Sequence, residues 1–305
     1  MPFEIRIVTE EACKFCEPTL ADDMARLHPG AKIRSLDHQS KEGRELLERH
    51  QARTLPVYVL DAAVEQDPNF QRLLPVAYYK SQGSYLIRHG PTNFYPNVQL
   101  DRKRTPRHLD LFFESLSGSS AQAEADFMRF LIQNEAALKD LTFSIHFLAT
   151  ESLMEKAAPA AQGPSIRTAS LAELPREADR AALTTARGEA EVQEDIRQLC
   201  LFQHSGIGTY FTYLNCRNKN LADPEQADRC LQPGERVRRC MDSGEGKRLL
   251  LQDARLAKEL ALDRAPVLLW ENRYGPFAFN ETDWRSLLLG RVELSKGASA
   301  RPKAQ

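Results

Sequence analysis

The chain has 305 residues, of which 42% are hydrophobic and 27% charged, so it is long enough for two domains with separate cores and is neither fibrous nor wholly disordered. Its 41 basic and 42 acidic residues give a net charge of −1, which provides no field that would attract a phosphate backbone, and nucleic acid is not an expected partner. No apolar run approaches the roughly 18 to 20 residues of a membrane-spanning helix, so no span is expected in this chain.

The N-terminal segment predicts a strand followed by a helix with two cysteines between them. Residues 3–8 alternate apolar and polar side chains, and residues 19–28 have apolar side chains at helical spacing. Cys13 and Cys16 form a C-x-x-C pair at the helix entrance, where free amides and the helix dipole stabilise a thiolate. Dithiol chemistry is the favoured interpretation. Half of a zinc site and two inert buried cysteines are the alternatives, although no second Cys or His pair follows at zinc spacing.

The next segments continue the α/β pattern. Residues 31–37 predict a strand, residues 41–50 a helix, and residues 57–60 an apolar strand that directly follows Leu55-Pro56. A proline just ahead of a buried strand often indicates a fixed turn or a cis peptide bond. The C-x-x-C turn, the second βα unit and this proline together resemble the thioredoxin/glutaredoxin fold. The resemblance implies that Pro56 is cis beside the two sulfurs and that Leu55 and Pro56 receive the substrate chain.

The first domain is expected to end near residue 104. Residues 75–90 predict a hairpin with Ser-Gln-Gly as its turn, and residues 101–107 carry four basic side chains. We interpret this basic segment as a solvated linker, with an interaction patch as the alternative. The expected domains are residues 1–104 and 105–292, followed by a disordered tail at 293–305.

The second domain starts again with a strand at 108–113, a long helix at 121–140 and another strand at 140–150. Three stretches, DLFFESLSGSSAQAE, GEAEVQEDIRQLC and APVLLWEN, resemble a DsbA-like family of bacterial proteins. That family is related to gamma-interferon-inducible lysosomal thiol reductase and to domains fused to vitamin K epoxide reductase homologues. The fold class implied is α/β, with two tandem thioredoxin-like folds, the second carrying a helical insertion at about 185–260.

The active-site turn of this second domain is expected to be degenerate. The family places its nucleophilic cysteine where this chain has Ser117, in a turn that ends at Ser120, and places its cis-proline at Pro266. A serine hydroxyl cannot form a disulfide, so thiol exchange is excluded at this turn. A serine hydrolase is not expected, because no G-x-S-x-G elbow is present. The peptide-receiving groove beside Pro266 is expected to persist.

Four further cysteines lie in the helical insertion, spaced as C-x15-C-x13-C-x9-C, which suits neither an iron–sulfur cluster nor a zinc finger. Two structural disulfides are the best explanation. Of the three pairings open to four cysteines, we prefer Cys200 with Cys240 and Cys216 with Cys230. Such disulfides favour an extracytoplasmic, periplasmic location. The N-terminus lacks an apolar leader, so a cytoplasmic location is expected instead if Met1 is the native start.

Together these features predict a thiol-disulfide oxidoreductase that works through Cys13 and Cys16, without a cofactor or a metal. Its expected partners are protein thiols or disulfides, and a membrane redox partner or a larger assembly. The redox-inactive second domain is expected to bind a partner protein, or to dimerise, through the groove near Pro266. The competing hypothesis is a non-catalytic thioredoxin-fold binding or assembly subunit of a larger complex.

Overall fold

The computed structural model describes residues 3–11, 13, 20–88, 98–153, 181–223, 225–231, 233–279 and 287–288. The chain divides into two compact units. Unit 1 comprises Met1–His108 with Leu269–Phe277, and unit 2 comprises Leu109–Leu268 with Ala278–Gln305. Both contain helices and sheets, so the fold class is α/β, as predicted. The tail predicted at 293–305 lies outside the described residues, and the boundary predicted at residue 104 stays a prediction.

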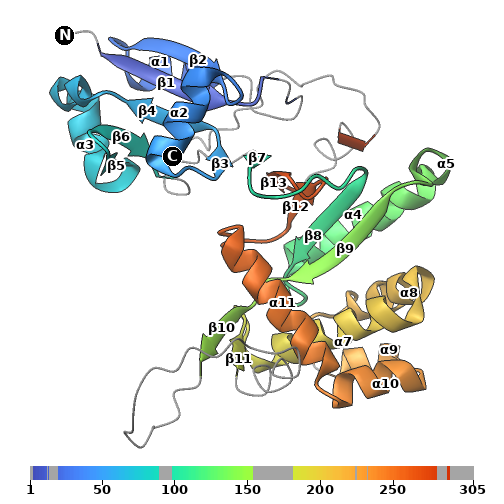
Figure 1. The fold of residues 1–305 in the computed structure, drawn as a ribbon. Helices are drawn as coiled ribbons and strands as arrows, with labels where there is room; N and C mark the ends of the chain where they lie inside the picture. Colours follow the sequence, from blue (N-terminus) through green and yellow to red (C-terminus); the bar gives the residue numbers. More distant parts are fainter. Residues whose placement is uncertain are drawn as a thin grey trace, which may run out of the picture. The chain divides into compact units, whose positions relative to one another are not determined.

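Unit 1 contains a five-stranded sheet in the order β2-β1-β4-β6-β5 (Figure 1). Its elements are β1 (Glu4–Thr9), α1 (Leu20–Leu27), β2 (Lys32–Asp37), α2 (Lys41–His50), β3 (Thr54–Leu55), β4 (Val57–Leu60), the 3-10 helix η1 (Ala62–Gln66), α3 (Pro68–Ala77), β5 (Tyr78–Ser81), β6 (Ser84–Ile87), β7 (Val98–Gln99) and β13 (Tyr274–Ala278). Strand β1 is parallel to β2 and antiparallel to β4, and β4 is antiparallel to β6. This arrangement is consistent with a thioredoxin-like fold.

The core of unit 1 forms because alternate residues of β1 face inward. Ile5 and Ile7 are fully buried, and Met24 of α1 packs in the same hydrophobic cluster. A polar contact is buried with them: the His28 ring lies 2.5 Å from an Asp67 oxygen and 2.7 Å from the Tyr78 hydroxyl. Both ring nitrogens are thereby satisfied, which is the condition for burying a histidine at low cost.

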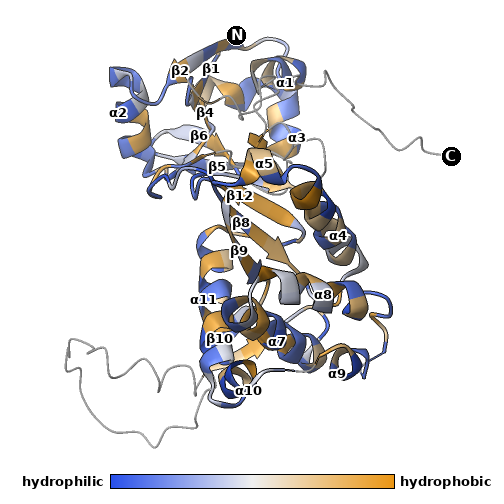
Figure 2. Cartoon of the chain, turned by 90° about the vertical axis from the view of Figure 1, so that its right-hand side faces the viewer, coloured by the Kyte–Doolittle hydropathy of each residue, from blue (hydrophilic) through white to orange (hydrophobic). Residues whose placement is uncertain are grey.

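Unit 2 contains the neighbouring strands β12-β8-β9 and a two-stranded antiparallel sheet of β10 and β11. Its elements are β8 (His108–Phe113), α4 (Gly118–Gln133), α5 (Glu135–Leu138), β9 (Thr142–Phe147), β10 (Thr150–Leu153), β11 (Ala181–Thr184), α7 (Glu189–Ser205), α8 (Ile207–Arg217), α9 (Gln226–Cys230), α10 (Glu235–Asp242), α11 (Glu245–Glu259) and β12 (Val267–Trp270). Figure 2 shows β8 and β12 as mostly hydrophobic, in keeping with their almost complete burial. In the described part of the chain, no helix has the length and apolar composition needed to cross a bilayer.

The helical insertion of unit 2 is cross-linked twice. Helices α10 and α11 pack on α7, and the Cys200–Cys240 disulfide joins α7 to α10. The Cys216–Cys230 disulfide joins α8 to α9. These are the two pairs that the sequence analysis prefers. Each closes a loop in the unfolded chain, which stabilises the fold by about 2 to 4 kcal/mol.

The basic segment 101–107 is largely exposed to solvent, but two of its arginines make specific contacts that the sequence does not suggest. The Arg102 guanidinium donates hydrogen bonds to the backbone and side-chain oxygens of Asn272, and Arg104 pairs with the buried carboxylate of Glu271. Both partners belong to the 269–277 segment of unit 1. Sequence reasoning missed these contacts because the partners lie some 170 positions away.

Unit 2 buries two groups that make its stability depend on pH. His146 of β9 lies between the carboxylates of Asp110 and Asp253, and although burial alone would lower its pKa, these carboxylates raise it to about 9. Glu124 of α4 accepts a hydrogen bond from Asn218, but burial raises its pKa to about 8. The fold therefore favours a protonated histidine and a protonated glutamate.

We expect the free energy of unfolding to fall as pH rises from about 5 to 9. The stability that protonated His146 contributes is lost as pH rises through about 9. Glu124 ionises near 4.5 in the unfolded chain but near 8 in the fold, so the free energy of unfolding falls with each pH unit between these values. In Glu124→Gln the free energy of unfolding should fall less steeply with pH, by about 1 kcal/mol per pH unit between pH 5 and 8. Urea unfolding at several pH values measures it, with Glu48→Gln on exposed α2 surface as control. Equal slopes in Glu124→Gln and the parent would contradict the assignment.

A second prediction concerns Gly246, at the contact of α11 with α7. A Cβ there would lie 2.7 Å from Ile196 Cγ2 and 2.8 Å from Cys200 Sγ. Gly246→Ala should therefore destabilise the oxidised chain by about 1 to 3 kcal/mol in urea unfolding. Gly208→Ala is the control, since nothing lies within 4 Å of its Cβ position in α8 and alanine should stabilise that helix. Equal effects of the two substitutions would show that the α7–α11 contact is loose.

Candidate functional site

Cys13 lies just beyond the carboxyl end of β1, where its amide donates a 3.0 Å hydrogen bond to the Glu10 carbonyl. It is half-buried and disulfide-bonded. Its predicted partner, Cys16, lies outside the described residues. Cys13 thus lies at the end of the sheet where the parallel strands β1 and β2 both terminate.

Asp37, the last residue of β2, anchors this turn. One carboxylate oxygen accepts the Glu11 amide at 2.9 Å, and the other accepts the Gln39 amide at 2.7 Å. Burial opposes ionisation of Asp37, but these two amides hold its pKa below the usual value. The backbone two residues before Cys13 is therefore fixed by a charged acceptor.

The Glu10 carboxylate ties the same turn to the returning segment of unit 1. Arg273 donates to one oxygen at 3.2 Å, and the Tyr274 hydroxyl donates to the other at 3.0 Å. Burial, together with the neighbouring Glu10 charge, raises the pKa of Tyr274, so its hydroxyl stays a donor. Sequence reasoning missed this contact because nothing local marks two residues more than 260 positions away as its partners.

The segment before Pro56 lies in a strand ladder. The Leu55–Pro56 peptide bond is cis, and Leu55 is fully buried. Strand β3 pairs antiparallel with β7, with Leu55 opposite Val98, and β7 pairs antiparallel with β13, with Val98 opposite Tyr274. The backbone to which the resemblance assigns the substrate chain is therefore already paired with the chain's own residues. The substrate role of Leu55 and Pro56 stays a prediction.

In unit 2, Ser117 and Ser120 lie at the start of α4, which is where the resemblance places the active-site turn. Ser117 precedes the helix, and its hydroxyl lies 2.8 Å from that of Ser119, a weak acid rather than a base. The Ser120 hydroxyl accepts the Glu114 amide at 3.0 Å. Both hydroxyls are nearly inaccessible, at 5% and 1% exposure for the two residues, and both serve local hydrogen bonds.

A cavity of about 460 Å³ adjoins this turn. It is lined by the first turns of α4, by Ala265–Val267 and by Phe279, with Asp126 and Arg264 at its polar margin. The Ala265–Pro266 bond is cis, and the Pro266 carbonyl accepts the Phe279 amide at 3.3 Å. Ala265 is half-exposed, and among the described residues none donates to or accepts from its backbone. Within the described part of the chain, the backbone of Ala265 is therefore unpaired, whereas that of Leu55 is paired with β7.

Helix α7 buries three acidic side chains inside unit 2, and the sequence analysis did not predict them. Glu191, Glu194 and Asp195 are all buried. One Glu191 oxygen accepts the Leu116 amide at 3.1 Å, which fixes the residue before Ser117, and burial raises the pKa of Asp195 well above its usual value. The available signal was their i, i+3, i+4 spacing, which puts them on one face of the helix.

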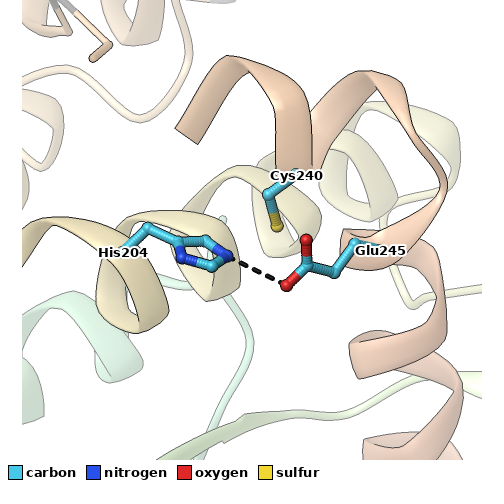
Figure 3. Close-up of side chains that lie close together, drawn as sticks. All are labelled: His204, Cys240 and Glu245. Carbon is cyan, nitrogen blue, oxygen red and sulfur yellow. Dashed lines mark hydrogen bonds and ion pairs between the residues drawn. The ribbon is translucent and has the colours of Figure 1, made fainter. Parts of the chain in front are cut away.

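Among the described residues, a single group could hold a metal ion by its donor atoms. Atoms of His204, Cys240 and Glu245 lie within 4.8 Å of one another (Figure 3). The Cys240 sulfur is bonded to Cys200, however, and a disulfide sulfur lacks the thiolate charge that binds metals. In the oxidised chain this group is a His204–Glu245 ion pair beside a disulfide.

No protein-family model matches the chain, and no curated protein matches its sequence. Among solved structures, it is similar to the MdbA protein, a thiol-disulfide oxidoreductase from Actinomyces oris. The two share 12% sequence identity, the match covers 61% of this chain and 81% of that chain, and the TM-score is 0.36.

The Glu10 contact leads to a prediction. Tyr274→Phe removes a hydrogen bond to a half-buried carboxylate and should cost about 1 to 3 kcal/mol in urea unfolding. It should also speed amide hydrogen exchange at Glu11 and Cys13, because the turn loses one of its anchors. Tyr79→Phe is the control, since that side chain is exposed. Unchanged exchange in the turn would mean that Tyr274 does not restrain it.

Proposed function

We propose that this chain is a thiol-disulfide oxidoreductase whose reactive pair is Cys13 and Cys16. The observation that carries the proposal is the disulfide-bonded Cys13 at the carboxyl end of β1, in a unit whose strand order is consistent with a thioredoxin-like fold. Unit 2 is then a second, DsbA-like thioredoxin fold in tandem with it, without a thiol at its active-site turn.

The reaction is a two-step exchange. In the reduced chain, the Cys13 thiolate attacks one sulfur of a substrate disulfide, forming a mixed disulfide and releasing the other substrate sulfur as a thiolate. The Cys16 thiolate then attacks Cys13 Sγ, which releases the second substrate sulfur. Two electrons pass to the substrate, its thiolates take up the two protons, and the chain is left with the Cys13–Cys16 disulfide. Oxidation of a substrate dithiol follows the same steps in reverse.

Partner recognition belongs to unit 2 in this proposal. The cavity beside Pro266 has apolar walls and one charge of each sign at its margin, and the half-exposed Ala265 has no backbone hydrogen bond to any of the described residues. An extended segment of a partner protein suits such a site, because its backbone can pair with Ala265 while one apolar side chain enters the cavity. The paired edge at Leu55 supports this division, since a substrate chain there would have to displace β7.

We place the protein in an oxidising, extracytoplasmic compartment. The Cys200–Cys240 and Cys216–Cys230 disulfides support this placement, because cytosolic thiol systems keep such pairs reduced. A membrane-bound redox protein is a suitable electron partner there.

A second function is a non-catalytic binding or assembly subunit. It is favoured by the serines at the start of α4 and by the strand that fills the edge beside Pro56. In that case the Cys13 disulfide is a structural cross-link that does not exchange while the protein is folded.

The Cys16→Ser variant separates the two functions. In the oxidoreductase, the freed Cys13 should form a mixed disulfide with oxidised glutathione under native conditions, and intact-mass measurement should find one adduct per chain that persists because no second thiol displaces it. Cys13→Ser is the matched control and should react more slowly, since the attacking sulfur is gone. Failure of Cys16→Ser to form an adduct without denaturant would support the assembly function instead.

A further inference from the structure

A cavity of about 430 Å³ lies between strand β1 and helix α2 of unit 1, two elements that pack against each other. Its lining is mostly charged and consists of Arg6 from β1 and Lys41, Glu42, Glu45, Leu46 and Arg49 from α2. None of these residues belongs to the C-x-x-C pair or to the cavity beside Pro266. A lining with three basic and two acidic side chains suits a charged ligand, and the ion pairs around it indicate the sign of the ligand's charge.

The Arg6 guanidinium lines this cavity with its hydrogen-bond donors unused. Its side chain is only 19% exposed, its Nε is buried, and it donates to none of the described residues. The nearest carboxylate oxygens belong to Glu4 and Glu42, at 3.8 and 4.0 Å, which is too long for a hydrogen bond. Withdrawing an unpaired charge from water is costly. An anion in the cavity would supply the missing acceptors.

The neighbouring Arg34 is the reason that Arg6 lacks a partner. The two arginines lie directly opposite each other on the parallel strands β1 and β2. Arg34 lies 2.5 Å from a Glu42 oxygen and 3.4 Å from a Glu4 oxygen, so it holds both carboxylates that are within reach of Arg6. Glu42 is therefore neutralised by Arg34 although it lines the cavity. The charge of Arg6 remains available to a ligand.

Helix α2 brings two more cations to the cavity. Lys41 lies in its first turn and Arg49 in its last, and both are exposed. Neither side chain forms a hydrogen bond or an ion pair with any residue that the structure describes. Burial is the main cause of the lowered pKa of His50, and the positive charges of Arg49 and Arg6 lower it further. The charges of Arg6 and Arg49 therefore both act near the C-terminal end of α2.

We propose that this cavity binds a sugar or polyol phosphate, with the phosphate group at Arg6 and Arg49. A guanidinium suits this group because its planar fork donates two parallel hydrogen bonds to phosphate oxygens. Arg6 is also partly withdrawn from water, where such a hydrogen bond is stronger than in full solvent. The site is independent of the disulfide exchange proposed for Cys13 and Cys16.

Glu45 determines what the rest of the ligand must be. It lies on α2 halfway between Lys41 and Arg49, and the spacing puts all three on one face of the helix. Its carboxylate forms no ion pair within the described part of the chain. A free carboxylate repels a bare anion but accepts hydrogen bonds from hydroxyl groups. Lys41 lies about 12 Å from Arg49 along the helix axis, so the cavity has room for a hydroxylated group beyond the phosphate.

The test titrates the full-length, isotope-labelled chain with glucose 6-phosphate at constant ionic strength and follows it by NMR. We expect saturable shifts of the Arg6 Nε–H signal and of the backbone amides of Leu46 and Arg49. Inorganic phosphate should bind more weakly, because Glu45 repels it without gaining a hydroxyl donor, and glucose should not bind. Glu45→Gln should tighten the binding of inorganic phosphate about twofold or more, since it removes this repulsion.

Matched variants fix the location. Arg49→Gln should weaken glucose 6-phosphate binding at least about tenfold without affecting the fold, because this exposed side chain loses only its bond to the ligand. Arg6→Lys keeps the charge but loses the planar fork, so it should weaken binding too. Arg44→Gln is the control, since Arg44 is exposed on the same helix but outside the cavity, where it donates to the Gln39 carbonyl.

Three results would each overturn the proposal. One is the absence of saturable shifts with glucose 6-phosphate, and another is an equal loss of affinity in Arg49→Gln and Arg44→Gln. The third is tighter binding of inorganic phosphate than of glucose 6-phosphate by the parent chain.

Discussion

The contact of Glu10 with Arg273 and Tyr274 is the constraint on which the arrangement of unit 1 depends. It joins the turn that carries Cys13 to strand β13, more than 260 positions away. Strand β13 pairs with β7, and β7 pairs with β3, the strand that ends at the cis bond before Pro56. The turn with the cysteine and the strand before the proline are therefore held by one continuous set of hydrogen bonds within unit 1. A reactive disulfide benefits from this, because its surroundings are fixed before a substrate arrives.

The two cis X–Pro segments have opposite environments, and this contrast shapes the functional proposal. Leu55 is fully buried and strand-paired, whereas Ala265 is half-exposed beside a cavity. The serines at the start of α4 make local hydrogen bonds. The neighbouring cavity is therefore the part of that turn that could receive a partner. These environments fit the proposal that disulfide exchange takes place in unit 1 and that a partner protein binds to unit 2.

Much of the fold could be predicted from sequence. The strands at 57–60 and 108–113 begin and end at the predicted residues, because apolar runs bounded by polar residues or proline mark buried strands well. The helix predicted at 121–140 is wrong in extent: it starts at Gly118 and ends at Gln133, and the Asn134 side chain bonds the Phe130 carbonyl, an interaction that competes with continuing the helix. Helix α3 was not predicted, since Pro75 obscures it, although Asp67 and Pro68 form an ordinary helix start. Within the candidate site, the C-x-x-C pair could be recognised from neighbouring residues of the sequence. The Glu10 contact and the buried acids of α7 could not, because both depend on which surfaces meet after folding.

The central claim is that the Cys13 disulfide exchanges with external thiols while the chain stays folded, and that the two disulfides of the insertion do not. The direct measurement is to treat the native protein briefly with dithiothreitol, block free thiols with an alkylating agent, and locate the labels by mass spectrometry of the digested chain. The account predicts labels at Cys13 and Cys16, with Cys200, Cys216, Cys230 and Cys240 unlabelled until denaturant is added. Unlabelled Cys13 in the native protein, with labels appearing only after unfolding, would contradict it.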